Sequence, residues 1–326
     1  MFWMIDRSNV KLSHEDDPQE RRLLDWYCDK IIAKINNTDE WKKHQYLKRN
    51  KEKINKILLH VIKSRVNFMK ERCKFLTEFL KKRTINLEID KLMNYETFFH
   101  KKNGISYTLS KYLNCNVCVY CGRIYTTTVY DENGGELIKP AFDHYFPKDK
   151  DKYPLLALSF YNLIPSCNYC NSSIKRTKEF DLEKHYFPYT ENASSVNEDF
   201  AFSYTYKSVD KPEINIDVKD KNSKAKETLN FMYTKDVYQY HNNYELKALL
   251  RKRDKYPLTR IKEIMDQTKG ILSEEDIYHF ILGEDVGLDD EEELNRPLFK
   301  LKNDLAKEIF PEGFNILRNK NAKKVI

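Results

Sequence analysis

The chain has 326 residues, of which 40% are hydrophobic and 33% charged, with a formal net charge of +7 at pH 7. This length and apolar content suffice for two or three modules with a sizeable core, and the basic balance favours a polyanionic partner. No apolar run approaches the roughly 18 residues of a membrane span. The first residues, MFWMIDRSNVKL, lack the apolar stretch and cleavage site of a secretory signal, so we expect a cytoplasmic protein without membrane contact.

Residues 1–110 are predicted to form a basic, helical N-terminal region. In DDPQERRLLDWYCDKIIAKI, apolar residues from Leu23 to Ile35 recur on one helical face, behind acidic residues and a proline. Residues 42–83 also show helical spacing and hold fifteen Lys or Arg against three Glu, a balance of +12. Three interpretations stay open for that stretch: the solvated face of a long amphipathic helix, a surface that attracts nucleic-acid phosphates without reading sequence, or a docking face for a protein partner.

Residues 111–190 change to short β-like runs and turns. RIYTTTVY and ELIKPAFDHYF are predicted as strands joined by the hairpin-type turn DENGG, and YNLIPSC as another short strand. NSSIKRTKEF is predicted to open a helix, with Asn171 or Ser172 near its N-cap. Residues 191–326 begin with a possible strand pair, FAFSYTY and INIDV, and are otherwise mainly helical, with helices predicted around 257–268, 273–282 and 297–309. The expected fold class is therefore α+β.

Five of the seven cysteines cluster in the middle region, and an odd count in a large cytoplasmic chain argues against a disulfide framework. The pairs Cys118/Cys121 (CVYC) and Cys167/Cys170 (CNYC) supply four thiolates, the ligand set that suits tetrahedral Zn²⁺. Cys115 offers an alternative first pair with Cys118. Gly122 favours the pair Cys118/Cys121, because a glycine directly after the second cysteine suits a tight turn. With four sulfur ligands, this zinc would be structural and closed to substrate.

Several polar residues lie between or directly after these pairs. FDHYFP holds Asp143 and His144, YNLIP holds Asn162, and Asn171 follows the last cysteine. Each alone is an ordinary surface, turn or capping residue. Together, the D-H-x-x-P, N-L and C-x-x-C-N-x-x-x-K motifs inside a zinc site closely resemble the HNH endonucleases, which have the ββα-metal fold. Asn171 stands in place of the third His of the family name. The resemblance is specific over about residues 115–190.

The resemblance implies a metal-dependent endonuclease that hydrolyses DNA phosphodiester bonds. Asp143 then supplies a hard oxygen ligand for Mg²⁺ or Mn²⁺, and Asn171 a second, neutral one. His144, whose unperturbed pKa would be near 6.5, is the general base that activates water. By the same resemblance, Asn162 orders the loop that holds the His144 segment. Neighbouring side chains of a strand point to opposite faces, so Asp143 and His144 flank one site only if the strand bends or ends there.

Basic residues near this site are candidates for nucleic-acid binding. Lys175, Arg176 and Lys178, in IKRTK, lie where a phosphate backbone could be gripped. His185, in KHYFPY, echoes the DHYFP segment and either contacts phosphate or packs beside its aromatic neighbours.

The regions that flank the core suggest a biological setting by resemblance alone. RPLFKLKNDLAKEI is similar to C-terminal regions of some bacterial HNH proteins of phage defence, and the overall build resembles the nuclease partner of an ATPase in Septu-type anti-phage systems. The chain has no G-x-x-x-x-G-K-[ST] loop, so nucleotide hydrolysis would come from a partner. One such site cuts one strand, so double-strand cleavage requires a homodimer or repeated nicking. The alternatives are a free-standing or mobile-element HNH nuclease, an RNA-directed one, and a zinc-ribbon nucleic-acid-binding or adaptor protein without catalysis.

Overall fold

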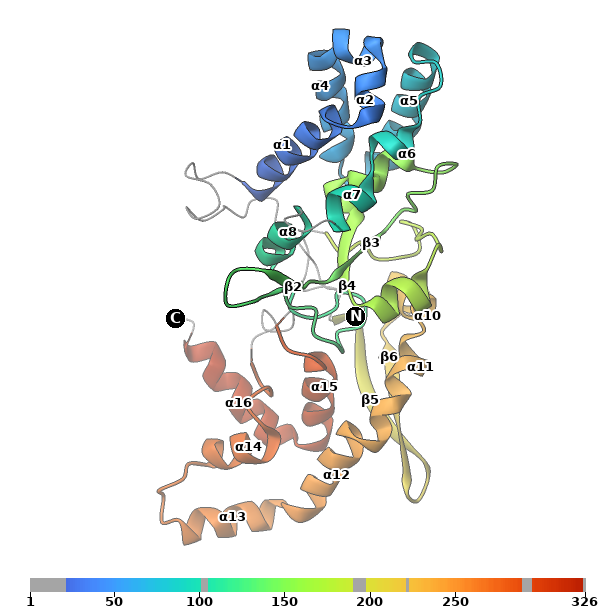
Figure 1. The fold of residues 1–326 in the computed structure, drawn as a ribbon. Helices are drawn as coiled ribbons and strands as arrows, with labels where there is room; N and C mark the ends of the chain where they lie inside the picture. Colours follow the sequence, from blue (N-terminus) through green and yellow to red (C-terminus); the bar gives the residue numbers. More distant parts are fainter. Residues whose placement is uncertain (1–21, 101–104, 190–197, 221–222, 289–294, 325–326) are drawn as a thin grey trace. The chain divides into compact units, whose positions relative to one another are not determined.

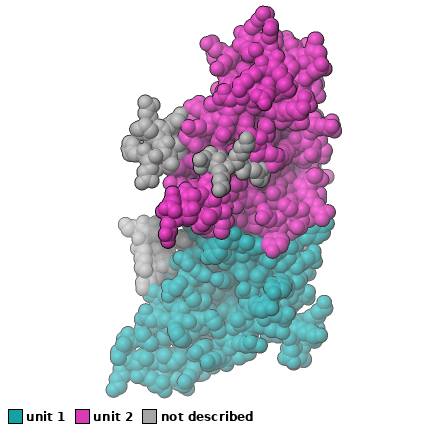
Figure 2. Space-filling model, viewed as in Figure 1, with its two compact units in different colours: residues 1–3, 120–125, 192–326 teal, residues 4–119, 126–191 magenta. Residues whose placement is uncertain are grey.

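The structure is a computed structural model that describes residues 22–100, 105–189, 198–220, 223–288 and 295–324. Figure 2 shows two compact units: unit 1 comprises residues 1–3, 120–125 and 192–326, and unit 2 comprises residues 4–119 and 126–191. Helices predominate, and the sheets of the described residues are small, two-stranded and antiparallel. The predicted α+β class is confirmed. None of the described helices is both long enough and apolar enough to cross a membrane.

The N-terminal part of unit 2 is helical, as predicted (Figure 1). Its helices are α1 (Leu23–Asn36), α2 (Asp39–Lys43), α3 (Gln45–Arg49), α4 (Lys51–Ile62), α5 (Val66–Arg83), α6 (Ile89–Leu92), α7 (Tyr95–His100) and α8 (Ile105–Leu113). In α1 the predicted apolar face is buried, including Leu23, Tyr27 and Ile31. The proline and most acidic residues expected near its start lie outside the described residues.

The basic stretch 42–83 is not one long helix, which corrects the simplest of its three interpretations. Helix α4 ends at Ile62 and α5 begins at Val66, with Arg65 in an extended conformation at the N-cap of α5. Each helix buries its own apolar stripe, so the helical spacing continues in the sequence although the backbone turns. The hydrophobic periodicity does not predict this turn. The turn also lacks the glycine or proline that usually marks one in a sequence.

The strands of unit 2 form two separate pairs. β1 (Val129–Tyr130) pairs with β2 (Glu136–Ile138), and the DENGG turn between them is present as predicted. β3 (Ala141–His144) pairs antiparallel with β4 (Leu163–Ser166), so that His144 lies opposite Leu163. The predicted long strand ELIKPAFDHYF is therefore divided between two sheets. Pro140 explains the division, because proline has no N–H to donate to a continuous ladder.

Short helical segments connect these strands and join them to the N-terminal helices. They are η1 (Pro154–Leu158), η2 (Phe160–Asn162) and, after β4, the π-helical η3 (Tyr169–Lys175). The buried Tyr27 hydroxyl donates to the carbonyl of Leu158, 3.0 Å away. The Ser159 hydroxyl donates to the carbonyl of Val61 at 3.2 Å. Helices α1 and α4 thus hold the loop between β3 and β4 in place.

The C-terminal segment of unit 1 contains the predicted strand pair, β5 (Phe200–Ser208) and β6 (Lys211–Val218), which is antiparallel. The remaining elements are α10 (Lys224–Phe231), α11 (Thr234–Gln239), η4 (Tyr240–Asn243), α12 (Glu245–Lys255), α13 (Leu258–Gln267), α14 (Glu274–Leu282), α15 (Phe299–Ile309) and α16 (Pro311–Lys324). Helices α13, α14 and α15 lie where the sequence predicts them. The Phe202 and Tyr238 rings stack with centroids 4.6 Å apart, and the Asp304 carboxylate accepts the Phe202 N–H at 2.8 Å.

Candidate functional site

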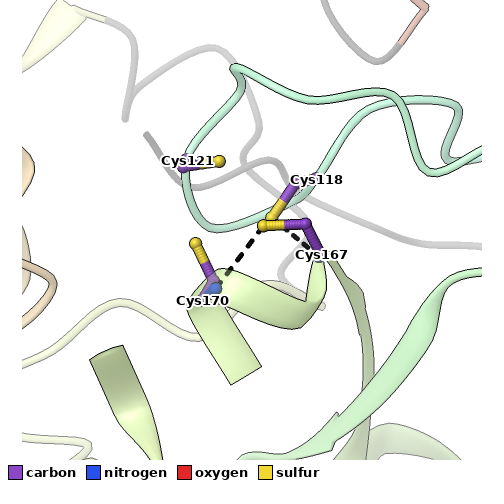
Figure 3. A group of neighbouring side chains, drawn as sticks. All are labelled: Cys118, Cys121, Cys167 and Cys170. Carbon is purple, nitrogen blue, oxygen red and sulfur yellow. Dashed lines mark hydrogen bonds between the residues drawn. The ribbon is translucent and has the colours of Figure 1, made fainter. Parts of the chain in front are cut away.

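Four cysteines converge on one point (Figure 3). The Sγ atoms of Cys118, Cys121, Cys167 and Cys170 all lie within 4.8 Å of one another, and all four residues are buried. A tetrahedral zinc ion with bonds of about 2.3 Å holds its sulfur ligands roughly 3.8 Å apart. The four residues, called the cysteine cluster below, can therefore hold a metal ion such as zinc after only a small contraction.

The backbone around the cysteine cluster supports this pairing of residues. The Cys167 N–H donates to the Sγ of Cys118 at 3.2 Å, and the Cys170 N–H donates to the Sγ of Cys167 at 3.5 Å (Figure 3). Amide donors of this kind stabilise thiolates. Gly122 has a φ of +58°, a left-handed conformation that glycine adopts without steric cost. The cluster uses the favoured first pair, while the Cys115 thiol lies outside it and donates to the carbonyl of Leu113 at 3.4 Å.

Asp143 forms a buried ion pair with Lys175. The carboxylate oxygens lie 3.2 and 3.1 Å from the Lys175 Nζ, and this ammonium also donates to the backbone carbonyl of His144. The two side chains are 3% and 1% exposed, respectively. Burial lowers the pKa of Lys175, and the attraction of the Asp143 carboxylate offsets this effect only in part. A positive charge therefore already lies beside the only carboxylate of the D-H motif.

His144 lies at the end of β3 and is held from the other side. Its Nε2 is 3.0 Å from the carbonyl of Ala157, and its ring packs edge-on against Tyr95 with centroids 4.6 Å apart. A carbonyl can only accept, so Nε2 carries the proton and Nδ1 keeps its lone pair. Burial lowers the pKa of His144 to about 3. The imidazole is therefore neutral throughout the physiological pH range.

The Asp-His step itself is extended and stays in register with β4. Neither residue has a positive φ, and the backbone bends only after them, at Tyr145 and Phe146. The strand instead ends at His144, the other arrangement that the sequence allowed. The two side chains accordingly contact different groups: the carboxylate meets Lys175 of η3, and the imidazole meets Ala157 of η1 and Tyr95 of α7.

Asn162 closes the loop between β3 and β4 through its side chain. The amide oxygen accepts the N–H of Phe146 at 2.8 Å, and the amide nitrogen donates to the carbonyls of Phe146 and Leu156, each at 3.0 Å. The Asn162 carbonyl also accepts the Tyr145 N–H at 2.9 Å. Asn162 is fully buried, and its hydrogen bonds fix the residues that directly follow His144. These are the backbone bonds expected of a loop-ordering residue.

Asn171 lies in the first turn of η3. The N-cap of this segment is Asn168, so neither Asn171 nor Ser172 is the cap. The Arg176 N–H donates to the Asn171 carbonyl at 2.9 Å, the five-residue spacing of a π-helix. Residues one helical turn apart share a face, and Lys175 follows Asn171 by four positions. The partly exposed Asn171 is thus on the same side of η3 as the lysine that contacts Asp143.

The four residues expected to bind phosphate occupy different environments. Lys175 is buried against Asp143 and does not reach the surface, which differs from the expected surface position. Arg176 is exposed, with a φ of +52°, and Lys178 is partly exposed. His185 is buried, packs edge-on against Phe180, and accepts the Asp181 N–H through Nδ1 at 2.9 Å. Of the two interpretations of His185, phosphate contact and packing beside aromatic residues, this environment agrees with the second.

Two groups around His144 could not be foreseen from the sequence. Tyr95 contributes its ring to His144 and donates its hydroxyl to the Phe142 carbonyl at 3.3 Å. Ala157 contributes only a backbone carbonyl, which any residue possesses. Tyr95 belongs to a helical run far upstream, and no spacing rule connects it with the D-H motif. Comparisons of the chain with protein families, with curated proteins and with solved structures found no match.

Proposed function

We propose that the protein is a metal-dependent HNH endonuclease that hydrolyses DNA phosphodiester bonds. The observation that carries the proposal is the arrangement of β3, β4 and η3 beside the cysteine cluster. In this arrangement β3 carries Asp143 and His144, η3 carries Asn171, and Asn162 fixes the loop between β3 and β4. The order strand, strand, helix of β3, β4 and η3, next to a cluster that could hold a structural zinc ion, supports the proposed ββα-metal fold.

In this proposal His144 is the general base. Its Nε2–H is fixed by the Ala157 carbonyl, so Nδ1 is the nitrogen that accepts a proton from water. The low pKa keeps this nitrogen unprotonated at neutral pH, but it also makes the imidazole a weak base. Mg²⁺ or Mn²⁺ would stabilise negative charge on the scissile phosphate and lower the pKa of the attacking water. Asp143 and Asn171 provide oxygen atoms suited to either ion, once Lys175 releases the carboxylate.

The proposed substrate and setting follow from the sequence. The net charge of +7 favours a nucleic acid, and exposed Arg176 with partly exposed Lys178 would contact phosphate next to η3. On the resemblance alone, we further propose a cytoplasmic role in anti-phage defence with an ATPase partner. The chain has no phosphate-binding loop of its own, so any nucleotide hydrolysis would come from that partner. Cleavage of both strands would require a homodimer or two successive nicks.

Supercoiled plasmid tests the proposal directly. Zinc-loaded wild-type protein should nick it in Mn²⁺ or Mg²⁺ and leave it intact in EDTA. His144→Ala and Asn171→Ala should lose this activity with one zinc per chain retained. Two matched controls should keep it: His60→Ala, at an exposed histidine of α4, and Asn168→Ala, at the exposed asparagine between Cys167 and Cys170. Equal cleavage by His144→Ala would show that another site or a contaminant is responsible.

One observation favours a second candidate, a zinc-bearing nucleic-acid-binding or adaptor protein without catalysis. Asp143 is buried and already paired with Lys175, as a purely structural carboxylate would be. This candidate predicts nucleic-acid binding in EDTA and no cleavage in Mn²⁺, with or without a candidate ATPase. An RNA strand in place of the plasmid distinguishes the RNA-directed form of the first proposal.

A further inference from the structure

Helix α5 carries a row of aromatic and cationic side chains on its outer face. The row consists of Phe68, Arg72, Phe75, Phe79 and Arg83 and is called the α5 stripe below. Its spacing of three and four residues places all five on one side of the helix. The buried side of α5 is formed by Met69, Cys73, Leu76 and Leu80, each one position further along the chain. The α5 stripe is therefore not the face that packs into the core.

Two of the three phenylalanines of the α5 stripe are largely exposed, and Phe79 is partly exposed. Phe75 is 69% exposed and Phe68 is 52% exposed. The Phe75 and Phe79 rings stack on each other with centroids 6.4 Å apart. A row of exposed aromatic rings on one helix is costly in water unless a ligand covers it, so such patches mark interaction sites.

Arginine side chains already lie on these rings. The Arg83 guanidinium is 3.9 Å from the centroid of Phe79, and the Arg72 guanidinium is 5.2 Å from that of Phe68. Arg72 also donates to the carbonyl of His60 at 3.1 Å, which fixes its orientation. The stripe thus presents flat apolar faces together with positive charge in a partly preorganised form.

The charge of α5 selects among possible partners. The helix holds six Lys or Arg and two Glu, a balance of +4, within a stretch whose balance is +12. A polyanion is attracted to this surface, whereas an apolar protein groove would have to desolvate the charges. Duplex DNA offers phosphates but keeps its bases stacked inside. A single strand offers both phosphates and free base faces, and aromatic side chains with arginine are the usual means of binding it.

We propose that the α5 stripe binds single-stranded or unpaired nucleic acid, with bases stacked on Phe68 and Phe75 and phosphates held by the neighbouring arginines and lysines. The inference rests on the proposed nuclease function and deepens it by naming the substrate class. Its connection to the candidate site is Lys70 of α5, which pairs with Glu179 at 2.5 Å and lies 4.4 Å from the ring centroid of Phe146. Phe146 follows His144 by two residues, so α5 and the candidate site belong to the same packed unit.

The test is equilibrium binding in EDTA, where cleavage cannot occur. Three fluorescent probes of about 20 nucleotides per strand are compared by anisotropy: a mixed-sequence single strand, an abasic strand with the same phosphates, and a duplex. The wild type should bind the mixed strand at least about fivefold more tightly than the abasic strand, because only the former can stack. Equal binding of these two strands would overturn the proposal, and so would an absence of binding to any probe.

Variants assign the effect to the stripe. Phe68→Ala/Phe75→Ala should weaken binding of the mixed strand roughly 5- to 30-fold and leave abasic binding unchanged. Phe280→Ala, at an 80% exposed phenylalanine of α14 in unit 1, is the matched control and should change neither. Phe75→Ala alone guards against misfolding of the double variant, and both should melt like the wild type. Unchanged affinity in the double variant refutes the proposal, as expected if the stripe docks on a protein instead.

The salt dependence separates stacking from charge. In Lys81→Gln/Lys82→Gln, the plot of the logarithm of the binding constant against the logarithm of the salt concentration should become less steep. The slope should decrease in magnitude by about 0.7 for each phosphate that is no longer neutralised. The phenylalanine variants should keep the wild-type slope. A phenylalanine variant that changes the slope instead would show that the rings only position charges, which contradicts the proposal. Because no step requires catalysis, a failed plasmid assay and a failed binding assay remain separate results.

Discussion

Replacing Lys175 by methionine should destabilise the protein strongly, because it removes the ammonium that neutralises the buried Asp143 carboxylate. The two side chains are only 1% and 3% exposed, and the Nζ–oxygen distances are 3.1 and 3.2 Å. Breaking a buried ion pair by removing one member costs about 3–5 kcal/mol of unfolding free energy. At about 2–4 °C per kcal/mol, the midpoint of thermal unfolding should fall by roughly 6–20 °C.

The assay is thermal and urea unfolding of zinc-loaded protein, followed by circular dichroism. Lys184→Met is the control, since this lysine is 67% exposed and lies 3.9 Å from Asp181, a surface contact of little energetic value. The double variant Asp143→Asn/Lys175→Met should lose less unfolding free energy than the sum of the losses in the two single variants. The reason is that it removes both charges of the buried pair together. A Lys175→Met protein that melts within about 2 °C of the wild type would refute the reasoning.

The same variants test the proposed cation site without an activity measurement. In Lys175→Met no ammonium competes with Mn²⁺ for the carboxylate, so the ion should restore stability by about 2.7 kcal/mol at a concentration 100 times its Kd. The wild type should gain less, because Lys175 has to be displaced first. Asp143→Asn/Lys175→Met should not respond. An equal response of all three proteins would show that Mn²⁺ binds elsewhere.

Three further outcomes are expected. Cys167→Ser should lose bound zinc and most tertiary structure, whereas Cys115→Ser should retain one zinc per chain by elemental analysis. Asn162→Ala should lower the free energy of unfolding by about 1–3 kcal/mol for each backbone group of the loop left unsatisfied, and Asn162→Asp should not restore it, because a carboxylate cannot donate to the two carbonyls. The folded-state pKa of His144, about 3, lies below its ordinary value, so the unfolded chain binds the proton first. Stability should therefore fall as the pH drops below about 6.5, by up to about 1.4 kcal/mol per pH unit, and His144→Asn should show a shallower slope in urea titrations. An identical slope would exclude His144 as the source.

The sequence predicts best those elements whose characteristic residues recur at a regular spacing. Helical periodicity locates α1 and α13 to α15, and alternation locates the β5–β6 pair. The cysteine cluster can be foreseen because two C-x-x-C pairs with Gly122 after the second cysteine leave few geometries open. The break of the long strand at Pro140 also has a sequence signal, since proline interrupts a ladder, but the apolar and aromatic residues on both sides of it favour a single strand.

The parts that it misses depend on contacts between distant segments. Lys175 stands in a basic run, IKRTK, that looks like solvent-exposed surface, yet the fold turns it inward to Asp143, 32 residues away. Its only sequence signal is the four-residue interval from Asn171, which places the two on one helical face. Tyr95 is still further from His144, and aromatic residues in helices are ordinarily core residues. Such partners become visible only when the tertiary fold is known.

The cysteine cluster has a consequence for the order in which the molecule assembles. Cys118 and Cys167 are 49 residues apart, and β3, η1, η2 and β4 all lie within the loop that a bound metal ion would close. Closing a loop of this length in advance removes about 4 kcal/mol of chain entropy from the unfolded state. A metal ion could join the two cysteine pairs only after Cys170 has been synthesised, and its binding would then favour the pairing of β3 with β4. For the proposed nuclease, metal supply would then help to set when the candidate site matures.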